Sequence, residues 1–115
     1  MAMDDMDVPQ CEVGELPDEF GGTAVLLDVR EPDEWRSGHA PGAQHIPLGD
    51  VPGRLGEIDS EKELFVVCHF GGRSQRVAQY LQRNGFDAVN VVGGMVAWAA
   101  SGRPVVTDDG SPGTI

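Results

Sequence analysis

The chain has 115 residues, enough for one domain with a single hydrophobic core that needs no disulfide or metal to fold. Nineteen acidic residues against eight basic ones give a formal net charge of −11. This charge disfavours general binding to nucleic acid or to anionic membranes, because both carry the same sign of charge. An anionic substrate would therefore need a local positive site.

The two ends of the chain are expected to be tails. Residues 1–9 start with an acidic stretch that lacks the basic start and apolar run of a signal peptide, and we expect them to be flexible. Residues 105–115 are rich in Gly, Asp and Pro and are expected to form a flexible C-terminal tail. Residues 10–104 then form the folded domain. No apolar stretch is long enough to span a bilayer, and we expect a cytoplasmic protein.

The chain contains only two cysteines, Cys11 and Cys68, in different sequence contexts. Their wide spacing and the scattered histidines do not fit a zinc pattern, and no metal site is expected. In a reducing cytoplasm a cysteine is more often chemical than structural.

In the first half of the chain, the pattern of apolar residues predicts short strands and one short helix between them. Strands are expected at 10–13 and 24–29, where the second is a continuous apolar run typical of a strand buried on both faces. Pro32 and the acidic residues after it predict a helix that ends at Ser37-Gly38. A short strand at 43–46 is followed by apolar residues at helical spacing, interrupted by Gly and Pro, over 48–58.

The second half alternates strands and helices more clearly. Apolar runs at 64–67 and 88–92 predict two further buried strands. A helix is expected from Ser74 to the Asn84-Gly85 stop signal, and another over 94–101. This alternation predicts an α/β fold with a mostly parallel central sheet of about five short strands flanked by helices. In such sheets ligands bind beyond the carboxyl ends of the strands.

One cysteine lies at that position. The strand 64–67 runs directly into Cys68, and a helix follows within a few residues. The thiol is therefore expected to face the amino end of a helix, where unpaired N–H groups and the helix dipole favour a thiolate. Gly71 and Gly72 let the backbone curl into an anion-binding loop, and Arg73 adds a positive charge. Such a loop fits a thiolate, a persulfide or an oxyanion such as a phosphate group.

Four segments resemble, in their usual order, the signatures of the rhodanese domain family. They are Asp28–Trp35, Gly38–Pro47, Cys68–Ser74 and Val92–Trp98. The resemblance covers about residues 10–104 and implies a three-layer α/β sandwich and sulfurtransferase activity. Cys68 would attack the outer sulfur of a donor such as thiosulfate, carry it as a persulfide and pass it to an acceptor. No cofactor is implied.

The resemblance also implies roles for other residues. The loop residues would bind the donor and stabilise the persulfide; they are His69, Phe70, Gly71, Gly72, Arg73 and Ser74. Asp28, Arg30 and His39 belong to the signatures, and we expect them to tie loops together through hydrogen bonds. His69 is expected to line the mouth of the pocket. Phe70 is expected at its rim, either as a docking point for a partner or as filler.

Two other functions stay open. One is a cysteine-dependent phosphatase or arsenate reductase, and the other is a non-catalytic module that carries sulfur or senses through protein contacts. Protein tyrosine phosphatases place five residues between the cysteine and the arginine, whereas four separate Cys68 from Arg73 here. This shorter loop favours a terminal sulfur over a phosphate group. The expected partners are a small sulfur donor (thiosulfate or a persulfide) and a thiol, cyanide or protein acceptor, with the chain a monomer or weak homodimer.

Overall fold

The computed structural model describes residues 8–115, so most of the predicted N-terminal tail lies outside the described residues. Its centre is a sheet of five strands in the order β1-β5-β4-β2-β3, and every pair of neighbours is parallel. The strands are β1 Gln10–Glu12, β2 Ala24–Asp28, β3 Gln44–His45, β4 Glu63–Val67 and β5 Ala88–Val92. This confirms the predicted α/β fold with a mostly parallel sheet.

The helices begin and end where their sequence signals lie. They are α1 Pro32–Ser37, α2 Gly72–Arg83 and α3 Gly94–Ala100, with short 3-10 segments η1 Val13–Glu15 and η2 Leu48–Glu57. Proline occupies the first turn of α1, where a backbone N–H would have no hydrogen-bond acceptor within the helix, so its absence costs nothing. α2 begins two residues before the predicted Ser74, because Gly71 takes a left-handed conformation and turns the chain into the helix at once.

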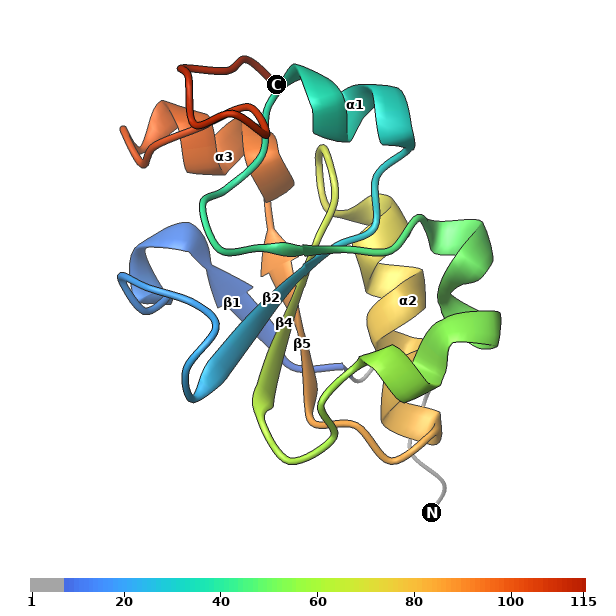
Figure 1. Cartoon of the computed structure of the whole chain (residues 1–115). Helices are drawn as coiled ribbons and strands as arrows, with labels where there is room; N and C mark the ends of the chain where they lie inside the picture. Colours follow the sequence, from blue (N-terminus) through green and yellow to red (C-terminus); the bar gives the residue numbers. More distant parts are fainter. Residues whose placement is uncertain (1–7) are drawn as a thin grey trace.

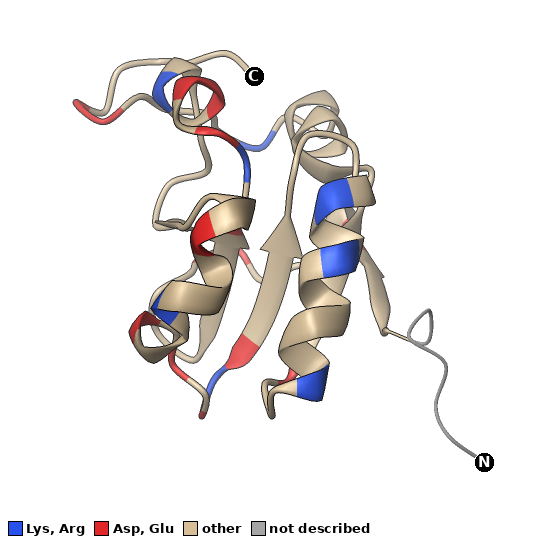
Figure 2. Cartoon of the chain, turned by 90° about the vertical axis from the view of Figure 1, so that its right-hand side faces the viewer, with Lys and Arg blue, Asp and Glu red and all other residues tan. Residues whose placement is uncertain are grey.

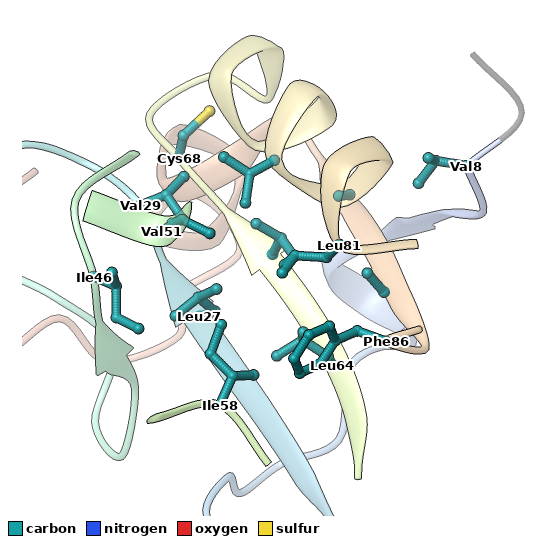
Figure 3. Close-up of a cluster of buried hydrophobic side chains, with 14 residues drawn as sticks. Val8, Leu27, Val29, Ile46, Val51, Ile58, Leu64, Cys68, Leu81 and Phe86 are labelled. Carbon is teal, nitrogen blue, oxygen red and sulfur yellow. The ribbon is translucent and has the colours of Figure 1, made fainter. Parts of the chain in front are cut away.

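Helices cover both faces of the sheet (Figure 1). One apolar cluster lies between the sheet and the α2 and η2 segments, and it includes Leu27, Leu64, Val66 and Leu81 (Figure 3). The second cluster lies on the opposite face, under α3 and η1, and includes Trp98. The central strands are therefore buried on both sides, which is the physical reason for their continuous apolar sequence.

The C-terminal residues are hydrogen-bonded to the body of the domain. The stretch predicted to be a flexible tail folds back along the end of α1, where His39 and Val106 exchange backbone hydrogen bonds of 2.8 and 2.9 Å. The N–H of Thr114 donates to the carbonyl of Ser37 at 2.8 Å. A β-carbon on Gly38 would lie 2.3 Å from the Thr114 carbonyl oxygen, so glycine is needed at this close approach.

Within residues 8–115, no helix combines the length and the apolar character that crossing a bilayer requires.

Candidate active site

The loop after β4 wraps its backbone around the sulfur of Cys68. The side chain lies at the carboxyl end of the central strand β4 and is almost completely buried, with 1 % of its surface exposed. Its Sγ accepts hydrogen bonds from the N–H of Gly71 at 3.1 Å and from the N–H of Ser74 at 3.3 Å. The Ser74 hydroxyl lies 3.3 Å from the same sulfur. The two N–H groups therefore direct their partial positive charges at the sulfur.

The local sequence produces this arrangement. Gly71 has φ +116°, a conformation that side chains rarely adopt, and this brings its N–H round to face the sulfur three residues back. The helix α2 then starts at Gly72, so the N–H groups of its first turn have no acceptor within the helix. The loop therefore offers further donors, besides those already bonded to Cys68, for an anion.

The start of α3 holds the other side of the loop. The N–H of Met95 donates to the carbonyl of Cys68 at 2.8 Å, and the N–H of Val96 donates to the carbonyl of His69 at 3.1 Å. The N–H groups of Met95 and Val96 near the start of α3 are thus capped by the Cys68 loop. A β-carbon on Gly94 would lie 2.4 Å from the Cys68 carbonyl oxygen, closer than any real contact. Gly93 and Gly94 both have positive φ, and the missing β-carbon of Gly94 allows the start of α3 to touch the loop backbone.

A chain of buried polar side chains leads away from the sulfur. The Ser74 hydroxyl lies 2.6 Å from the Asn90 Oδ1 in the middle of β5, and both residues are buried. The Asn90 amide donates in turn to the Gln10 Oε1 at 2.8 Å. This second bond orients the Asn90 amide so that its oxygen faces Ser74. The position of the hydroxyl beside Cys68 is therefore determined by strands β1 and β5.

Arg73 does not present a free charge to the loop. Its two terminal nitrogens donate to the two carboxylate oxygens of Glu34 in α1, at 2.7 and 3.0 Å. The hydrogen bond from Arg73 lowers the pKa of Glu34 from its usual value to about 2. The same bond raises the pKa of Arg73. The arginine that the sequence placed in the anion cradle is thus compensated by an acid from another element.

The remaining loop residues form its outer edge. Phe70 exposes 69 % of its surface, the largest exposure of any large apolar residue among those described. The His69 ring meets it edge-on, with ring centres 4.6 Å apart. His69 is partly buried.

Asp28 and Arg30 form a fully buried ion pair that joins β2 to the segment after α1. The Arg30 Nε and Nη2 atoms donate to the Asp28 carboxylate at 2.8 to 3.0 Å, and Nη2 also donates to the Gly38 carbonyl at 2.7 Å. Both side chains have no exposed surface. Neither residue is among the hydrogen-bond partners of the Cys68 sulfur. This geometry fits the expected role of tying loops together.

His39 also belongs to this supporting region. Its Nδ1 atom lies 2.8 Å from the Trp35 carbonyl, and its ring stacks on the Trp35 ring with centres 3.6 Å apart. Its Nε2 atom lies 3.5 Å from the Asp108 carboxylate of the C-terminal segment. His39 therefore joins α1 to the end of the chain.

The sulfur of Cys11 faces a carbonyl oxygen, that of Glu12 at 3.3 Å, rather than backbone N–H groups. The residue lies in the edge strand β1, and burial, together with nearby Glu15 and Glu63, raises the pKa of its thiol. A raised pKa disfavours the reactive thiolate. Within residues 8–115, no group of three or more His, Cys, Asp or Glu side chains is placed to hold a metal ion.

Three contributors to the site were missed in the sequence. Asn90 carries a usable signal, because a polar residue inside an otherwise apolar strand must find a buried partner. Glu34 was interpreted only as a favourable charge at a helix start, and nothing in the sequence places it against Arg73. Gly94 was expected only as the start of a helix, and its contact with the Cys68 carbonyl depends on how α3 packs.

Comparisons with known proteins agree with this geometry. The rhodanese-like domain family matches residues 12–101. A Bacillus subtilis protein named "Putative sulfurtransferase YtwF" is 44% identical over 79 residues, covering 69% of this chain and 77% of the relative. A sulfurtransferase of Allochromatium vinosum is 36% identical over 87 residues, covering 75% of this chain and 81% of the relative.

A solved structure extends the likeness to the fold. A rhodanese-related protein from Thermoplasma volcanium superposes with a TM-score of 0.80 at 28% identity, covering 87% of this chain and 99% of that protein.

Proposed function

Because the chain belongs to the rhodanese-like domain family, in which its relatives bear sulfurtransferase names, we propose that it transfers sulfane sulfur through a persulfide on Cys68. The observation that carries this proposal is the convergence of two backbone donors on one sulfur. The N–H groups of Gly71 and Ser74 lie 3.1 and 3.3 Å from the Cys68 Sγ.

The reaction proceeds by double displacement. The Cys68 thiolate attacks the outer sulfur of the donor, the bond between the two donor sulfurs breaks, and the leaving group departs with the electron pair. The thiophilic acceptor then attacks the outer sulfur of the persulfide and regenerates the thiolate. Both steps move a sulfur atom between nucleophiles, so neither needs a metal, a cofactor or an external oxidant.

The loop assists by holding negative charge without reorganising. Its donors are fixed by α2 on one side and by the start of α3 on the other. The charge moves from Sγ to the outer sulfur when the persulfide forms, and the first turn of α2 offers N–H groups at Gly72 and Arg73 for that atom. Preorganised donors of this kind stabilise the developing anion more than mobile water does.

The same donors favour sulfur over phosphorus chemistry. Those described above bond to Sγ itself, and the thiol is 1 % exposed, so the reacting group must reach the thiol through the loop. A single terminal sulfur suits this approach better than a tetrahedral phosphate, which needs donors arranged around three oxygens.

The proposal is tested by intact mass spectrometry after incubation with a sulfur donor. Wild type and Cys11→Ala, which removes the other free thiol, are expected to gain one sulfur atom that cyanide then removes. Cys68→Ala is expected to gain none. Sulfur on Cys68→Ala, or its loss in Cys11→Ala alone, would place the chemistry elsewhere. Turnover of a phosphoester by the wild type without any sulfuration would favour the phosphatase function.

A further inference from the structure

The cation of the catalytic loop is fully engaged by Glu34. The two residues form a bidentate pair with bonds of 2.7 and 3.0 Å, although they come from elements 39 positions apart in the chain. The side chains of Arg73 and Glu34 are 37% and 29% exposed to solvent. The pair therefore lies at the edge of the site, where its charges act on a substrate that approaches from solvent. Glu31 adds a second negative charge to the field at Arg73.

The pair does not open by protonation under working conditions. The pKa of Glu34 is about 2, so its carboxylate is ionised throughout the neutral range. A donor that carries its own negative charge must therefore compete with a permanent carboxylate for Arg73. That competition takes place on a protein with a net charge of −11, whose overall field repels anions.

Two other arginines of the domain lie in different surroundings from Arg73. Figure 2 shows basic residues along α2 and no acidic ones. The next of these, Arg76, lines a groove between η2 and α2 with Leu48, Val77 and Tyr80. Arg30 is buried against Asp28 and has no exposed surface.

The outer edge of the loop is apolar. Phe70 exposes 69 % of its surface there, next to the ring of His69. The two common kinds of sulfane donor place different groups at this edge when their outer sulfur enters the loop. Thiosulfate places a sulfonate with the remaining negative charge, whereas the persulfide of an organic thiol places an uncharged sulfur and its carbon chain. The second group suits a neutral ion pair and an aromatic ring better.

Resting on the proposed function, we propose that the sulfur donor is a persulfide of an organic thiol rather than thiosulfate, and that Glu34 sets this preference by cancelling the charge of Arg73. Glu34 acts through Arg73 and is a specificity-determining residue, not a catalytic one.

The donor step balances without a further reactant. The Cys68 thiolate bonds to the outer sulfur of R–S–SH, the S–S bond of the donor breaks, and R–S⁻ leaves with the electron pair. The proton of the outer sulfur stays on the new Cys68 persulfide or passes to R–S⁻, which gives the thiol. With thiosulfate the leaving group is sulfite, which carries two negative charges past the Glu34 carboxylate.

The test is a cycle of charge variants assayed with both donors. The rate of Cys68 sulfuration, as kcat/KM, is measured with thiosulfate and with the persulfide of 2-mercaptoethanol, whose carbon chain carries no charge. The proteins are wild type, Glu34→Gln, Arg73→Gln and the double variant. Glutamine at 34 keeps an oxygen for Arg73 and is nearly isosteric. The ratio of the two donors is compared between variants, so their different intrinsic reactivities cancel.

The expected pattern follows the sign of the charge left unpaired. Glu34→Gln leaves the positive charge of Arg73 uncompensated. It should raise the ratio of kcat/KM for thiosulfate to kcat/KM for the persulfide about tenfold. Arg73→Gln frees a negative charge and should lower it, and the double variant should return to the wild-type ratio. A structural role alone would slow both donors together in every variant, without this sign pattern. The matched control is Glu57→Gln, which breaks a similar bidentate pair with Arg54 in η2. It should leave the ratio unchanged.

Two results overturn the inference and leave the proposed function standing. One is a wild type that uses thiosulfate as readily as the persulfide, and the other is a ratio in Glu34→Gln equal to that in Glu57→Gln. Failure of both donors to add sulfur to Cys68 in every variant would instead remove the proposed function, and the inference with it. If Glu34→Gln fails to fold, the comparison of Arg73→Gln with wild type still shows whether the donor ratio falls, as the inference requires.

Discussion

Replacing Gly94 with alanine tests whether the start of α3 holds the Cys68 loop in place. The added β-carbon would lie 2.4 Å from the Cys68 carbonyl oxygen and 2.5 Å from that of His69. Both contacts are shorter than van der Waals distance and involve backbone atoms, so either the helix or the loop must move.

The expected loss of stability in Gly94→Ala is the sum of backbone strain and weakened hydrogen bonds. Alanine at φ +56° costs about 1 kcal/mol, because the left-handed region is unfavourable for side chains. Separating α3 from the loop also weakens the two hydrogen bonds that Met95 and Val96 donate, each worth about 1 kcal/mol. The free energy of unfolding should therefore fall by about 3 kcal/mol in Gly94→Ala, a large part of the stability of a small domain.

A matched glycine isolates the contact from the backbone strain. Gly102 also has a positive φ of +85°, but a β-carbon there would meet no atom within 4 Å. Gly102→Ala should cost only about 1 kcal/mol. Urea unfolding of both variants, with the sulfuration rate of Cys68 measured alongside, separates the two effects. Equal destabilisation of the two variants, with an unchanged sulfuration rate in Gly94→Ala, would refute the claim that α3 holds the loop.

The other predictions concern the network around the sulfur and the two ion pairs. Ser74→Ala removes the hydroxyl that ties this residue to Asn90 and so positions its N–H beside Sγ, and it should slow sulfuration of Cys68 about tenfold in stopped-flow assays, whereas an unchanged rate would mean that the hydroxyl serves only the fold. Asp28→Asn leaves the buried Arg30 charge uncompensated and should lower the free energy of unfolding by about 3 kcal/mol, and a loss near zero in denaturant titrations would contradict the buried pairing. Because the folded-state pKa of Glu34 is depressed from 4.5 to about 2, its pair with Arg73 adds stability that is present above pH 4.5 and disappears as the pH falls towards 2. The stability difference between wild type and Glu34→Gln, measured by unfolding across this range, should shrink over the same interval, and a difference independent of pH would contradict the pairing.

The elements were predictable because their signals are local. A continuous apolar run, a proline in a first turn or a glycine after a helix reflects the backbone and burial needs of its own segment. The position of Cys68 followed from the same reasoning, since a strand that ends in a glycine-rich turn before a helix places its next residue at the sheet edge. Gly71 and Ser74 accordingly lie against the sulfur, as expected of the loop.

The sequence could not show which side chains meet across the fold. The charge of Arg73 was expected to serve the anion cradle, but packing brings Glu34 of α1 within 2.7 Å of it. The C-terminal segment has a composition typical of a tail, and its backbone hydrogen bonds to Ser37 and His39 come from the close approach at Gly38. Contacts of this kind depend on the relative placement of distant elements, which no local pattern encodes.

The most direct test of the account follows one labelled sulfur atom through the whole reaction. Donor labelled in its outer sulfur is mixed with stoichiometric protein, the protein is separated from small molecules, and cyanide is then added. We expect the label to remain with wild type and with Cys11→Ala, to be absent from Cys68→Ala, and to leave as labelled thiocyanate. Thiocyanate formed by wild type without any labelled protein intermediate, or label retained by Cys68→Ala, would contradict the claim that Cys68 carries the sulfur.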